Sequence, residues 1–171
     1  CQVADGIATG TMADAQGSSS ISIGAISEAA ENAVCVGRSG TASGLRSCAI
    51  GYIAQSLGLS SVAMGDDAQA QAAYAVALGI SSRATVGDAT AVGSQAQATA
   101  TGATAVGRQT IASGDYSLAL GGGDLAGVHG AEAAAADSVA LGRGASTTAG
   151  GTGGAAVGKG SSIGAAGVEG F

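Results

Sequence analysis

The chain has 171 residues, of which 32 are glycine, and it contains no proline and no tryptophan. Its formal net charge is −6, and aromatic residues make up only 2% of it. These values exclude collagen, which needs abundant proline, and a conventional nucleic-acid-binding domain, which needs basic and stacking side chains.

The hydrophobic residues are mostly alanine and valine, so they do not predict the core of large side chains that ordinary globular domains bury. A disordered Gly/Ala/Ser segment is an alternative on composition alone. The hydrophobic fraction of 46% and the charged fraction of 11% speak against it, because disorder usually combines low hydrophobicity with high charge. No stretch approaches about 18 consecutive apolar residues, so we expect no membrane-spanning helix.

A tetrad of apolar, small, apolar and glycine residues repeats along the chain, from residues 7–10 to residues 155–158. Its glycines are Gly10, Gly24, Gly37, Gly51, Gly65, Gly79, Gly93, Gly107, Gly121, Gly142 and Gly158. The steps between them are 14 and 13 residues, then six of 14 in succession, then 21 and 16. This period predicts a solenoid with one coil per repeat, and each tetrad predicts one short strand of a coil.

A second strand is predicted after each tetrad. The residues three and five positions after the glycine are small, and the residue between them is mostly polar, as in Ala68, Gln69 and Ala70. Alternation with a period of two is typical of a strand that has one buried face and one solvent face. Each coil is therefore expected to hold two short strands that stack in parallel on those of the next coil.

The small residues of both strands are predicted to point into the coil, because two strands and two turns in about 14 residues leave a narrow lumen. The larger apolar residues of the tetrads then form two columns on the outside. The opposite geometry, with the apolar pairs inside and the alanines outside, remains an alternative. It would leave a monomer with no need to assemble.

An outward apolar stripe of this length predicts a partner, since monomeric proteins rarely expose such a patch. The simplest partner is another copy of the chain, and the sequence does not say how many copies assemble. The predicted interface consists of Ile21, Ile23, Val34, Val36, Cys48, Ile50, Val62, Met64, Val76, Leu78, Val92, Val106, Leu118, Leu120, Val139 and Leu141.

The repeat resembles the head repeat of YadA-like trimeric autotransporter adhesins. Residues 61–65 (Ser-Val-Ala-Met-Gly) and 138–142 (Ser-Val-Ala-Leu-Gly) carry this resemblance, which extends over residues 4–164. The resemblance implies an all-β fold, a left-handed parallel β-roll assembled as a homotrimer. It also implies adhesion to host extracellular matrix or cell-surface receptors, a role in virulence, and display at the surface of the bacterial outer membrane.

Proteins of this family have a coiled-coil stalk and a C-terminal β-barrel anchor, and neither pattern is found in this sequence. We expect residues 1–171 to be a single head segment, and membrane anchoring to come only from segments absent from this chain. Within it we expect regular coils over residues 4–121, an insertion over 122–136 and irregular terminal coils over 137–171.

The insertion lies where the step from Gly121 to Gly142 carries extra residues. It is interpreted either as a plain bulged loop between coils or as a protruding recognition loop, because loops on rigid scaffolds often carry binding. The candidate recognition residues are Asp124, Leu125, Val128, His129 and Glu132.

No enzymatic activity, cofactor or metal is predicted. Residues 153–159 resemble the start of a phosphate-binding loop, but Gly160 stands where serine or threonine is required. His129 is the only histidine and has no acid at a recognisable spacing, which argues against acid–base catalysis. Cys35 and Cys48 have opposite parity in their strands, so a disulfide between them is not expected.

The sequence therefore predicts an adhesin head that acts through multivalent display, with no nucleic-acid partner. Another structural solenoid, such as a phage fibre segment or an ice-binding protein, is the alternative. Ice binding needs a flat array of repeated threonines. The column that holds Thr90 and Thr104 also holds valine, leucine and cysteine.

Overall fold

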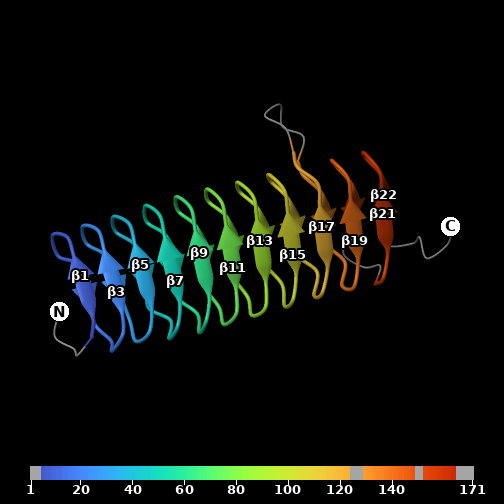
Figure 1. The fold of residues 1–171 in the computed structure, drawn as a ribbon. Helices are drawn as coiled ribbons and strands as arrows, with labels where there is room; N and C mark the ends of the chain where they lie inside the picture. The colour runs from blue at the N-terminus through green and yellow to red at the C-terminus, as the bar shows by residue number, and fades with distance from the viewer. Residues whose placement is uncertain (1–4, 124–128, 149–151, 165–171) are drawn as a thin grey trace.

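The computed structural model describes residues 5–123, 129–148 and 152–164. In this part of the chain the backbone winds into a straight rod of stacked coils, with β1 and β21 at its two ends (Figure 1). Each coil contributes a strand of three residues and a strand of two residues. The strands form two parallel sheets of 11 strands each, which are called sheet A and sheet B.

Sheet A consists of β1 (Ile7–Thr9), β3 (Ile21–Ile23), β5 (Val34–Val36), β7 (Cys48–Ile50), β9 (Val62–Met64), β11 (Val76–Leu78), β13 (Thr90–Val92), β15 (Thr104–Val106), β17 (Leu118–Leu120), β19 (Val139–Leu141) and β21 (Ala155–Val157). Sheet B consists of β2 (Asp14–Ala15), β4 (Glu28–Ala29), β6 (Thr41–Ala42), β8 (Gln55–Ser56), β10 (Gln69–Ala70), β12 (Arg83–Ala84), β14 (Gln97–Ala98), β16 (Ile111–Ala112), β18 (Glu132–Ala133), β20 (Ser146–Thr147) and β22 (Ser162–Ile163). The predicted all-β parallel solenoid of about 14-residue coils is confirmed.

Neighbouring coils stack with equivalent positions in register. Val76 in β11, for example, pairs with Val62 in β9 on one side and with Thr90 in β13 on the other. Every side chain of the repeat therefore stands in a column of its equivalents, about 4.8 Å apart along the rod.

The lumen between the two sheets is filled by small side chains. Ala63 and Ala68 are fully buried on opposite sides of one coil, and so is Ala70. The predicted inward direction of the small residues is thus confirmed, and the alternative with the apolar pairs inside is wrong. A further inward position, directly before the tetrad, is not part of the prediction. Ser61 and Ala75 occupy it and are fully buried.

Hydroxyl groups in the lumen find partners inside it. Ser56 Oγ lies 2.7 Å from Ser61 Oγ, and Ser61 Oγ donates a hydrogen bond to the carbonyl oxygen of Gly58 at 2.8 Å. Serine can therefore replace alanine in the interior without leaving a buried polar group unpaired. The described residues include one exception, the buried Oγ of Ser47, which has no hydrogen-bond partner.

Side chains that face each other across the lumen compensate for one another's size. Cys35 in β5 is buried opposite Gly40, and a Cβ atom on Gly40 would lie 2.8 Å from the Cys35 sulfur. Thr110 is buried in the same way against Gly130, where a Cβ would lie 2.8 Å from its methyl group. A large residue on one side thus requires glycine on the other.

The two described cysteines are free thiols, as expected from their opposite directions. Cys35 is buried in the lumen, whereas Cys48 is half-buried on the outer face of sheet A. Burial raises the pKa of the Cys35 thiol, and it raises that of Cys48 as well, so both sulfurs stay protonated at neutral pH. Cys1 lies outside the described residues.

The extra residues between Gly121 and Gly142 are confined to a shorter stretch than predicted. Residues 132–133 form β18, which pairs with β16 and β20 in the register of the other coils. Ala131 and Ala133 are buried in the lumen like their equivalents. The predicted insertion over 122–136 therefore ends earlier. The predicted irregular coils after residue 137 keep the register in their described part.

The glycine that ends each tetrad is required for two reasons. Its φ is positive, as at Gly65 (137°), and L side chains rarely adopt that conformation. A Cβ on Gly65 would also lie 2.5 Å from the carbonyl oxygen of Gly79 in the next coil. The turn thus brings two backbones together where no side chain fits.

Gly65→Ala is expected to lower the free energy of unfolding by at least about 3 kcal/mol, because strain at φ and overpacking against Gly79 add together. Gly87→Ala is the control, since its new Cβ would meet only the Ala73 carbonyl oxygen at 3.7 Å. Thermal and urea unfolding followed by far-UV circular dichroism measure both variants. Equal stability of the two variants would contradict this role of the glycine column.

Gly40→Ala is expected to destabilise the chain by about 1–3 kcal/mol through overpacking against Cys35. The same substitution in a Cys35→Ala background is expected to cost less than about 0.5 kcal/mol, because an Ala/Ala pair already fills the neighbouring coils. A double-mutant cycle of urea unfolding measures the coupling. Additive effects at the two sites would show that the residues do not compensate for each other.

Candidate functional site

The outer face of sheet A carries a continuous apolar stripe. It consists of the two outward residues of each strand, and all residues of the predicted interface lie in it. None of them is buried. Met64 is 41% exposed, and Leu120 and Leu141 are each 40% exposed. Thr90 and Thr104 interrupt one of the two columns.

The stripe reverses the usual distribution of side-chain sizes. In the described coils the fully buried side chains are alanine, serine, threonine and cysteine, while valine, leucine, isoleucine and methionine lie outside. Folding one chain therefore leaves its largest apolar side chains in contact with water.

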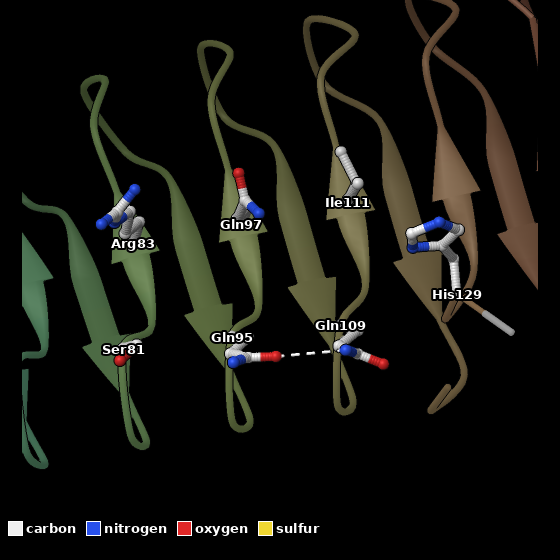
Figure 2. Close-up of a pocket in the computed structure, with 7 residues that line it drawn as sticks. All are labelled: Ser81, Arg83, Gln95, Gln97, Gln109, Ile111 and His129. Carbon is white, nitrogen blue, oxygen red and sulfur yellow. Dashed lines mark hydrogen bonds between the residues drawn. The ribbon is translucent and has the colours of Figure 1, made fainter. Parts of the chain in front are cut away.

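The outer face of sheet B is polar and holds a pocket. This sheet B pocket is lined by Ser81, Arg83, Gln95, Gln97, Gln109, Ile111 and His129. Figure 2 shows these side chains in two rows along the rod. One row follows the outward positions of β12, β14 and β16, and the other follows the turns that precede these strands.

The amide groups of the pocket are partly ordered by each other. Gln109 Nε2 donates a hydrogen bond to Gln95 Oε1 at 3.2 Å, across two neighbouring coils (Figure 2). Within the described residues the Oε1 atom of Gln109 is buried and has no hydrogen-bond donor. A buried acceptor without a partner costs free energy, so this atom marks the pocket as a place where a donor is missing.

The charge of the pocket differs from that of the chain. The chain has 12 acidic and 6 basic residues, but the lining contains no carboxylate. Arg83 lies at one end of the pocket and His129 at the other (Figure 2). The nearest acidic residue in these rows is Glu132, which stands beside Ile111 in the next coil.

The sequence of the central coils matches a family model described as the YadA head domain repeat, in which each match spans two copies of the repeat. The matches cover residues 42–68, 56–82, 70–96, 87–110 and 98–123. The chain carries YadA head repeats. No curated protein matches the chain at a significant level.

The coils on either side of residues 42–123 continue the architecture of the YadA head repeats. β3 pairs with β5, and β19 pairs with β21, each in the register seen in the matched part. Arg83, Gln97 and Ile111 of the pocket lie on matched repeats, whereas His129 follows them in the chain.

The structure brings one predicted recognition residue into the pocket. His129 is exposed and lines the end of the pocket. Glu132 is also exposed but lies in β18, one coil beyond the pocket, and not in a protruding loop. The other three candidates, Asp124, Leu125 and Val128, lie outside the described residues.

The glutamines of the pocket were not among the predicted site residues. Their signal in the sequence is a polar residue at the same two positions of successive coils, which is also what an ordinary solvent face looks like. Only the structure shows that His129 closes one end of the rows. The apparent phosphate-loop glycines follow β21, which is a copy of the repeat.

Residues 5–123, 129–148 and 152–164 hold no cluster of three or more metal-ligating side chains. They also hold no helix long and apolar enough to cross a membrane.

Proposed function

We propose that the chain is the head of a trimeric autotransporter adhesin, displayed at the bacterial cell surface, which attaches to host extracellular matrix or cell-surface receptors. Three chains stand side by side around one axis, and their coils wind left-handed as the family resemblance implies. The observation that carries the proposal is the apolar stripe on a chain of YadA head repeats.

The stripe is long enough to drive assembly. Eleven rungs at about 4.8 Å extend over roughly 50 Å. Each valine, leucine or isoleucine that becomes buried contributes about 1.5–3 kcal/mol. The lumen, filled by side chains that bury little area each, contributes far less per residue.

A second copy of the same chain fits the stripe because the repeat distance is identical in both. Columns of side chains spaced by one coil can interdigitate along the whole rod only with columns of equal spacing. Sheet B then faces outward from the assembly, because it forms the opposite wall of each coil.

Multivalent display is the proposed mechanism of adhesion. A rigid trimer presents three copies of any weak site on sheet B or its turns, so that avidity exceeds the affinity of a single site by about 10²–10⁴-fold. No chemical step is involved, and catalysis plays no part in the proposal.

An ice-binding or fibre role is less well supported. Thr90 and Thr104 stack in register, as an ice-binding array would require. However, the same column continues with Val76 on one side and Leu118 on the other, which breaks the threonine array.

The combined substitution Val76→Asp and Leu78→Asp is expected to abolish assembly and folding together, because it places charges in the buried stripe. Sedimentation equilibrium should give the wild-type chain about three times its mass of 15.7 kDa. Gln69→Asp with Gln71→Asp is the matched control, since it adds the same charge to the outer face of sheet B. A folded wild-type monomer would contradict the proposal, and so would a folded monomer of the Val76/Leu78 variant.

The assembled wild-type chain is expected to adhere to at least one surface coated with collagen, fibronectin or laminin, or to cultured host cells. Attachment is measured by surface plasmon resonance and cell-binding assays, with albumin-coated surfaces as the control. Retention on albumin equal to that on every matrix and cell surface would refute the adhesion part of the proposal, even for an intact trimer.

A further inference from the structure

We propose that the sheet B pocket binds an acidic saccharide, with the carboxylate of the sugar held by Arg83 and its hydroxyl groups held by the glutamine amides. The proposal names a ligand class for the adhesin surface. It rests on the proposed function only in that sheet B faces outward from the trimer.

The first argument is the hydrogen-bonding capacity of the lining. A glutamine amide offers two donors and an acceptor with two lone pairs, and sugar hydroxyls also both donate and accept. Gln95, Gln97 and Gln109 place three such groups on neighbouring coils. The rows span the coils of Ser81 to Gln109, which at about 4.8 Å per rung suits two or three sugar rings.

The buried Oε1 atom of Gln109 supports the same ligand class. It accepts no hydrogen bond in the described part of the chain, although its own Nε2 donates to Gln95. The terminal torsion of a glutamine is soft, so the amide can turn toward a hydroxyl donor in the pocket. A ligand that brings hydroxyl groups thereby removes the cost of the unpaired acceptor.

The second argument is charge. The pocket is the place on this acidic chain where Arg83 and several amides meet without a carboxylate in the lining. An exposed guanidinium can bind a carboxylate through two parallel hydrogen bonds, and this geometry favours carboxylate over neutral ligands. His129 adds a ring N–H or a lone pair at the far end, and Ile111 offers an apolar surface for the C–H face of a sugar ring (Figure 2).

An acidic peptide fits this place less well. Peptides that add to a sheet hydrogen-bond through a free edge. The strands under the pocket have no free edge, because β14 is paired with β12 on one side and β16 on the other. The lining also contains no aromatic residue, and only one apolar one, to receive peptide side chains.

The test is a calorimetric titration of the assembled wild-type chain with 3′-sialyllactose and with an unsulfated glucuronate-containing hexasaccharide. Lactose is the neutral probe and a deca-glutamate peptide is the acidic non-sugar probe. We expect saturable binding of at least one acidic saccharide, at least about tenfold tighter than lactose, because the carboxylate adds charge-assisted hydrogen bonds.

Arg83→Gln is expected to weaken binding of the acidic saccharide about tenfold or more. Gln97→Leu is expected to weaken lactose and the acidic saccharide alike, because it removes a hydroxyl contact and leaves the charge in place. Arg46→Gln is the matched control, since it removes the same charge from an exposed turn far from the pocket and should leave binding unchanged. Circular dichroism melting checks that each variant is folded.

Three results would overturn the proposal. They are no saturable binding of either acidic saccharide, equal weakening by Arg83→Gln and Arg46→Gln, and tighter binding of the glutamate peptide than of both saccharides. Sedimentation of the same samples reports assembly separately. Failed saccharide binding by an intact trimer therefore refutes the saccharide proposal alone, whereas a folded monomer that binds the saccharide refutes the trimer alone.

Discussion

The closeness of the two sheets is the constraint on which the rest of the structure depends. A coil of about 14 residues leaves a lumen so narrow that its inward positions hold only small side chains, and a pair such as Cys35 and Gly40 shows how little space is spare. The tetrad glycines arise from the same closeness, because successive turns bring backbone against backbone. Stability therefore comes from the ladders of backbone hydrogen bonds and from whatever covers the outside of the coil.

This constraint separates the two outer faces by role. Larger apolar residues have no place in the lumen, and they gather on sheet A, where Met64 and Leu120 are among the more exposed. Sheet B carries polar residues and is free to contact ligands. One chain thus has a face suited to assembly and a face suited to recognition, on opposite walls of the same coil.

Much of this arrangement could be predicted from the sequence, because a period of 14 and a parity of two assign each residue to a strand and a side. Other features depend on contacts that the period does not encode. The exchange of volume between Thr110 and Gly130 crosses the insertion. Ile26 and Ile53 sit in left-handed turns with φ of 60° and 55°, at a cost of about 1–2 kcal/mol each that stacking must offset. The end of the insertion was misplaced because alanines at 133–136 suit either a loop or a coil.

The insertion shows how such a rod can gain a site without losing its fold. Extra residues between β17 and β18 leave the turn and return to it, so that Ala131 and Ala133 occupy their ordinary places in the lumen. What changes is the outer surface, where His129 now stands at the end of rows formed by repeats. Because each coil contacts only its neighbours, insertions at turns and substitutions at outward positions can alter recognition while the lumen and the apolar stripe stay as they are.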